Sequence, residues 1–77
     1  GLMYLSKNQI EIIKNYFADK PVKSLYLFGS YATGNADEKS DIDLAFSLKD
    51  GTRISYFSLA KYLVDLETML NKKVALV

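Results

Sequence analysis

Apolar positions recur at helical spacing in two parts of the chain. The first stripe follows Ser6 and Gln9, which have the spacing of a capping box, and it stops at Pro21. Its members are Ile10, Ile13, Tyr16 and Phe17. A longer stripe occupies residues 56–70, and Asn71 followed by two lysines is typical of a helix C-terminus. The pattern therefore predicts an amphipathic helix before Pro21 and a second, longer one over residues 56–70.

Short apolar runs predict three strands. Residues 24–28 are apolar and aromatic and end at Gly29, residues 42–48 alternate, and residues 74–77 close the chain. In the alternating run, one face carries Ile42, Leu44, Phe46 and Leu48. Residues 31–40 form a polar connection that can open with one helical turn. The order helix, strand, loop, strand, helix, strand indicates one α/β (α+β) domain over residues 1–77, with two helices on one face of a small mixed sheet.

The aromatic side chains follow the periodicity of these elements. They are therefore expected in the core rather than as platforms on which a base stacks. This expectation covers Tyr16, Phe17, Tyr26, Phe28, Phe46 and Phe57.

Composition limits the chemistry available to the chain. Its 77 residues are 49% hydrophobic and 25% charged, as in a small globular domain, and a net charge of +1 does not indicate a nucleic-acid binder. Without cysteine or histidine, acids, bases and metal ligands must come from carboxylates, hydroxyls, Lys, Arg or Tyr. No apolar run has the length of a membrane span and the N-terminus does not resemble a signal peptide, so we expect a cytoplasmic protein. So small a domain has a thin margin of stability, which favours association with a partner or a second copy.

Two pairs of residues carry candidate chemistry. Asp41 and Asp43 lie two positions apart, so their side chains project from the same face of a strand, where two close carboxylates repel unless a cation lies between them. In a chain with this composition, such a pair favours Mg²⁺ or Mn²⁺, and Mg²⁺ is commonly held together with phosphate oxygens. Gly29 permits a close backbone approach and Ser30 adds a hydroxyl donor, a combination suited to a phosphate. Taken separately, each pair also fits a solvated strand end or an ordinary turn.

Together the two pairs match a known signature. Gly29 and Ser30, a spacer of ten residues, and then Asp41 and Asp43 resemble the Gly-Ser and Asp-x-Asp motif of the polymerase-beta-like nucleotidyltransferases. Within them the chain is most similar to the minimal nucleotidyltransferases, which are often paired with a helical partner protein in toxin–antitoxin systems. The motif covers residues 29–44, and the predicted order of elements also fits.

The resemblance implies a mechanism, and it also implies that this chain lacks one of the residues that the mechanism uses. Family members transfer a nucleoside monophosphate from a nucleoside triphosphate, here expected to be ATP, to an acceptor hydroxyl with two metal ions. Gly29 and Ser30 would then bind the triphosphate, and Asp41 and Asp43 would be the catalytic ligands of Mg²⁺. The family usually has a third carboxylate on a later strand, where this chain has Ala75. The resemblance thus implies that nucleotide binding is retained and that transfer is impaired.

Three functions remain open from the sequence: a nucleotidyltransferase, a nucleotide-binding or partner-binding module such as an antitoxin, and an interaction domain without nucleotide. Four other acidic residues could replace the third carboxylate, although helix surface and loop positions favour solvated roles; they are Asp37, Glu38, Asp65 and Glu67. Three basic residues could neutralise a triphosphate or be ordinary surface charges; they are Arg53, Lys72 and Lys73.

Overall fold

The chain begins with a capped helix. In the computed structural model, which describes residues 2–77, α1 spans Lys7–Phe17 and Ser6 is its N-cap. The Ser6 hydroxyl accepts a hydrogen bond from the backbone N–H of Gln9, and the Gln9 side chain accepts one from the N–H of Ser6. This reciprocal pair satisfies two backbone donors that the helical ladder leaves free, as the sequence predicts.

The three predicted strands form one sheet in the order β1-β2-β3. β1 (Val22–Phe28) pairs antiparallel with β2 (Ile42–Leu48), and β2 pairs parallel with β3 (Val74–Leu76). β1 begins two residues earlier than the pattern predicts, and its pairing with β2 is irregular between Val22 and Ser24. Parallel neighbours need a long crossover, and α3 (Tyr56–Leu70) provides it between β2 and β3.

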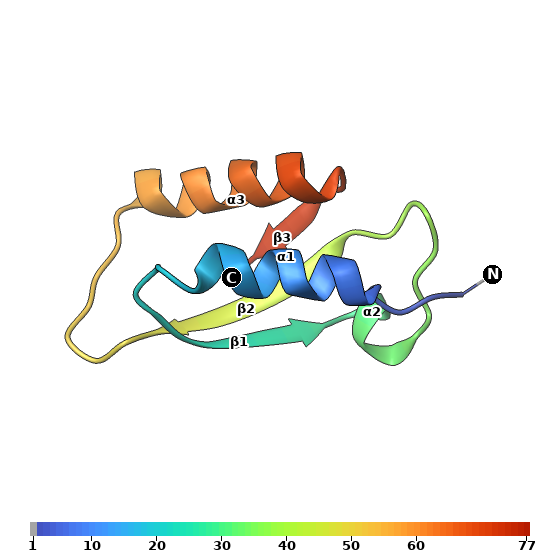
Figure 1. Cartoon of the computed structure of the whole chain (residues 1–77), viewed down its shortest axis with the longest axis horizontal. Coiled ribbons are helices and arrows are strands. Elements are labelled where there is room, and N and C mark those ends of the chain that lie inside the picture. Colours follow the sequence, from blue (N-terminus) through green and yellow to red (C-terminus); the bar gives the residue numbers. More distant parts are fainter. Residues whose placement is uncertain (1) are drawn as a thin grey trace.

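Both long helices lie on the same face of the sheet, which confirms the predicted fold class (Figure 1). The sheet contributes buried side chains from its inward positions to the core, and each helix contributes part of its predicted apolar stripe, although Ile10 of α1 is exposed by 41% and Tyr56 of α3 by 89%. The buried core consists of Ile13 and Phe17 from α1, Ile42 and Leu44 from β2, Tyr62, Leu66 and Leu70 from α3, Val74 from β3, and Tyr31 and Ala36 from the connection after β1. The alternation of β2 therefore correctly predicts which face is inside.

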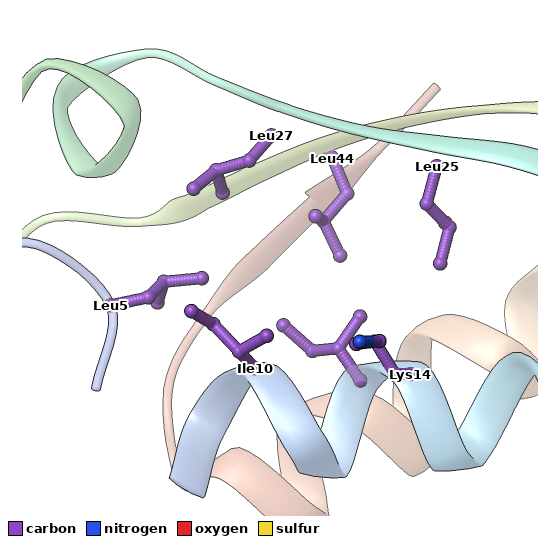
Figure 2. Close-up of a pocket in the computed structure, with 7 residues that line it drawn as sticks. Leu5, Ile10, Lys14, Leu25, Leu27 and Leu44 are labelled. Carbon is purple, nitrogen blue, oxygen red and sulfur yellow. The ribbon is translucent and has the colours of Figure 1, made fainter. Parts of the chain in front are cut away.

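An apolar groove lies between α1 and β1. Figure 2 shows Leu25, Leu27 and Leu44 pointing from the strands toward α1, with Ile10 and Lys14 opposite them. Leu5, from the segment before α1, lies at one end of this groove.

Not all aromatic residues enter the core. Phe17 is buried, and Tyr16 and Phe46 are half-buried, but Tyr26, Phe28 and Phe57 are exposed by 58%, 42% and 89%. The expectation of a core position was wrong for these three. Tyr26 and Phe28 alternate with inward leucines and so occupy the sheet face that neither long helix covers, whereas Phe57 lies on the outer side of α3.

Across residues 2–77, every helix is too short or too polar to cross a bilayer.

Candidate active site

The turn after β1 depends on glycine. Gly29 follows the last residue of β1 and is the N-cap of α2, the single helical turn Ser30–Thr33 that the sequence allows for. Its backbone has φ 72° and ψ −157°, a conformation almost confined to glycine. Gly34 ends α2 in the left-handed conformation with φ 78°. The chain therefore reverses within a few residues and leaves Gly29 and Ser30 at the end of the sheet.

The two aspartates lie at the start of β2. Because Ile42 and Leu44 are buried against the helices, Asp43 projects from the opposite, uncovered face, where it is half-buried. Asp41 precedes the strand and is exposed. In the part of the chain that the structure describes, neither carboxylate takes part in a side-chain hydrogen bond or an ion pair. Their oxygens therefore remain available to a ligand.

Antiparallel pairing brings the glycine turn against one of the aspartates. Phe28, the last residue of β1, is the register partner of Asp43. At the next position, a Cβ atom on Gly29 would collide with the Asp43 carboxylate. Gly29 from the first predicted pair and Asp43 from the second thus meet at one end of the sheet.

Ala75 lies beside the same aspartate on the other side. In the parallel ladder between β2 and β3, Asp43 is the register partner of Ala75. Residues in register on neighbouring strands share a face of the sheet. The third position in this row therefore carries a methyl group, and within residues 2–77 no cluster of three or more His, Cys, Asp or Glu residues could hold a metal ion.

Comparison with known proteins identifies the family. The family model described as "Polymerase beta, Nucleotidyltransferase" matches residues 11–77, which include the glycine turn, both aspartates and Ala75. The chain belongs to this nucleotidyltransferase family.

Two relatives come from Methanocaldococcus jannaschii. The chain is 39% identical over 74 residues to MJ1215, which covers 95% of this chain and 78% of the relative. It is 38% identical over 65 residues to MJ1379, which covers 83% of this chain and 65% of that relative. The names of both relatives describe a protein adenylyltransferase and mark the activity as unproven. No solved structure matches this chain with comparable significance.

Three other carboxylates of the chain have structural roles. Asp65 accepts hydrogen bonds from Lys61 at 2.8 Å and from the Tyr16 hydroxyl at 2.7 Å, and its pKa lies below its usual range because of these bonds, that from Lys61 above all. Glu67 accepts from the backbone N–H of Val74 at 3.0 Å and so supports the start of β3. Asp37 accepts from the Lys39 backbone N–H and from the Ser40 hydroxyl. Each of these acids thus has a hydrogen-bond partner within the fold, whereas their helix and loop positions favoured solvated roles.

The basic residues are divided between the two ends of the sheet. The Lys72 ammonium group donates to the Glu38 carbonyl at 2.9 Å and lies 5.4 Å from the centre of the Tyr31 ring. This contact ties the loop before Asp41 to the segment before β3. Sequence reasoning missed it, because no local pattern links positions that lie 34 residues apart. Arg53 lies in the connection at the far end of β2 and is separated from Asp41 by the length of that strand.

Proposed function

We propose that the chain transfers a nucleoside monophosphate from a nucleoside triphosphate, with ATP as donor, to a hydroxyl group of a protein. The contact between Gly29 and the Asp43 carboxylate supports this proposal, because it sets a close backbone approach for phosphate beside oxygen ligands for a cation. The names of the two archaeal relatives support the choice of adenylate as the transferred group and of a protein as the acceptor. With ATP as the donor, we also propose that the protein works in the cytoplasm.

The residues of the site fit a magnesium–nucleotide complex. Asp41 and Asp43 offer carboxylate oxygens that have no other partner among the described residues, and Mg²⁺ is commonly held by one or two carboxylates together with phosphate and water. Gly29, without a Cβ atom, lets the backbone of the turn lie close to the Asp43 carboxylate, and the Ser30 hydroxyl can donate to a phosphate oxygen. When bound, Mg²⁺ would neutralise charge on the triphosphate and on the departing pyrophosphate.

The proposed transfer exchanges one phosphorus–oxygen bond for another. The acceptor oxygen forms a bond to the α-phosphorus, the bond from that phosphorus to the bridging oxygen breaks, and pyrophosphate leaves with the electron pair. The hydroxyl proton passes to water, because position 75 beside Asp43 carries a methyl group and not a carboxylate that could take it or hold a second metal ion. We therefore propose that the chain binds nucleotide well and transfers it slowly.

Calorimetric titration of ATP into the protein tests the site directly. We expect binding in the presence of Mg²⁺, loss of that binding when Mg²⁺ is removed, and loss in Asp43→Asn. Asp50→Asn is a matched control, because Asp50 lies in the turn after β2, at the far end of the sheet. Release of pyrophosphate and labelling of protein from ATP labelled in the adenosine part then measure transfer. If the titration gives no heat with or without Mg²⁺, this chain does not bind ATP.

A second candidate function is favoured by the outer side of α3. Tyr56, Phe57 and Val64 are exposed by 89%, 89% and 59% on a helix whose other side is already buried in the core. A helix that is apolar on both sides fits a module that binds a partner protein, either a helical partner, with this chain as the antitoxin of a toxin–antitoxin pair, or a second copy.

This second function can be separated from the first by mutation. The chain is expressed together with the protein encoded next to it, and both are purified through a tag on one of them. We expect Phe57→Ser and Val64→Ser to abolish co-purification while leaving ATP binding unchanged. If the chain purifies alone and sediments as a monomer in its wild-type form, the partner-binding function is wrong.

A further inference from the structure

The uncovered face of the sheet carries a row of aromatic side chains next to the site. Phe28 and Tyr26 both lie on β1, two positions apart, and so point to the same face. Phe28 is in register with Asp43, and Tyr26 is in register with Ala45. These two aromatic residues thus form a line that starts beside the aspartate and runs away from Gly29 along β1.

The sheet surface beside these two aromatic residues carries small side chains. Ala45 lies on the same face of β2 as Asp43, two positions further along, and Ala75 faces the same side from β3. Small side chains on β2 and β3 thus lie next to the large aromatic side chains on β1. Phe28 is exposed by 42% and Tyr26 by 58%, so water reaches much of both rings.

Exposure of these rings leaves apolar area in contact with water, and the packing of the core does not require it. Large apolar side chains that lie together on a surface are typical of binding sites, because covering them removes apolar area from water. The inward residues Leu25 and Leu27 already pack against the buried core, so the fold does not need the outward aromatics for its core.

We infer that Phe28 and Tyr26 are a stacking platform for the base of the nucleotide whose phosphates bind at Gly29 and Asp43. This inference rests on the proposed function, which supplies the position of the phosphates. The ribose that separates the α-phosphate from the base spans about one step between cross-strand neighbours, roughly 5 Å, so a base can reach the ring of Phe28 from a phosphate beside Asp43. Ala45 leaves room beside Tyr26 for the rest of the base.

The platform defines the class of nucleotide. Stacking on an aromatic ring uses the π-face that every base has, and the strength of stacking, not a set of hydrogen bonds, then decides the preference. We therefore expect the site to accept several nucleoside triphosphates and to bind purine nucleotides more tightly than pyrimidine nucleotides.

The experiment compares two ligands that share the phosphates and differ in the base. ATP and inorganic tripolyphosphate, each with Mg²⁺, are titrated into the wild-type protein and into Phe28→Leu, Tyr26→Thr and Ala45→Leu. Phe28→Leu and Tyr26→Thr remove a ring and keep residues suited to a strand, and Ala45→Leu adds bulk on the uncovered face. Phe28→Tyr keeps the ring, and Tyr56→Ser removes an aromatic side chain that is 89% exposed at the first residue of α3. The start of α3 lies at the end of the molecule away from α2 (Figure 1).

We expect ATP affinity to fall about 5- to 100-fold in the three variants and tripolyphosphate affinity to stay within about twofold of wild type. Phe28→Tyr and Tyr56→Ser should bind both ligands as the wild type does. If ATP affinity is unchanged in all three variants, or if both ligands weaken equally in variants with wild-type melting temperatures, the platform is wrong and the phosphate site stands. If neither ligand binds the wild-type protein, the proposed function itself fails, and the platform fails with it.

Discussion

Gly29 meets two separate demands at one position. Its backbone conformation, with φ 72°, strains any residue that has a Cβ atom, and the place of that atom is taken by the Asp43 carboxylate. Gly51 shares only the first demand, since its φ is 76° and an added Cβ would meet nothing within 4 Å. The two glycines can therefore separate backbone strain from the geometry of the site.

We predict that Gly29→Ala and Gly51→Ala each lower the free energy of unfolding by about 1–2 kcal/mol, because both place alanine at positive φ. Only Gly29→Ala should reduce transfer, by roughly 100-fold, since it displaces Asp43. Urea unfolding gives the first quantity, and release of pyrophosphate from ATP gives the second. Equal activity in the two variants would show that the contact with Asp43 is not needed.

Replacing Ala75 with a carboxylate should increase the transfer activity. Because it is in register with Asp43, Ala75→Asp would place a carboxylate in the same row of the sheet. We predict a rise in the transfer rate of about 10²- to 10⁴-fold, the usual contribution of a group that assists proton transfer. Labelled-ATP transfer at saturating ATP measures it, with Ala75→Asn as the control for size. An unchanged rate in Ala75→Asp, together with normal ATP binding, would mean that position 75 does not limit transfer.

At the scale of elements, one polar contact joins the two long helices. The Tyr16 hydroxyl on α1 donates to the Asp65 carboxylate on α3 at 2.7 Å, and the rings of Tyr16, Phe17 and Tyr62 pack edge to face beside it. Burial, followed by the bond to Asp65, raises the pKa of the Tyr16 hydroxyl above its ordinary value of 10.0. The contact thus stabilises the pairing of helices that covers the sheet.

We predict that Tyr16→Phe lowers the free energy of unfolding at pH 7 by less than about 1 kcal/mol, since solvent reaches the pair. A raised pKa of Tyr16 stabilises the fold below pH 10.0, and this contribution is lost as the pH rises further. The lowered pKa of Asp65 stabilises the fold above pH 3.8, and this contribution is lost below it.

The difference between wild type and Tyr16→Phe should therefore be largest between these two pH values and shrink at both extremes. Urea unfolding at a series of pH values measures it, and Tyr4→Phe serves as a control because Tyr4 is 68% exposed. A difference that does not change with pH would contradict the assignment to this hydrogen bond.

At the scale of the whole molecule, a small and elongated chain has little stability to spare. Its extents are 42 × 20 × 19 Å, so much of its surface remains in contact with water. Magnesium and ATP, which by the proposed function bind only the folded chain, should therefore change its stability strongly.

We predict that Mg²⁺ with ATP at a hundred times its dissociation constant stabilises the fold by about 2.7 kcal/mol and raises the melting temperature by roughly 10–20 °C. Chelation of Mg²⁺ with EDTA should remove the whole increase. Thermal unfolding followed by circular dichroism measures both effects. A melting temperature that does not change when ATP and Mg²⁺ are added would count against binding at the described site.

Most of the fold follows from local pattern. The capping box at Ser6, the stripe of α3 and the alternation of β2 fix their elements because each depends on neighbouring residues. The exposure of Tyr26 and Phe28 does not follow from their run of apolar residues, since an edge strand covered on one side and a strand covered on both sides look alike over so short a stretch.

The sequence by itself determined the order of elements, the glycine turn and the family signature, because these depend on residue type and spacing along the chain. Only the tertiary structure decided which residues from distant segments are neighbours. The pairing of β1 with β2 brings Gly29 against Asp43, the parallel pairing of β3 sets Ala75 next to the same carboxylate, and the side chosen by both helices leaves Phe28 uncovered. Register between strands and the choice of a covered face arise from packing between distant segments, which no local pattern records.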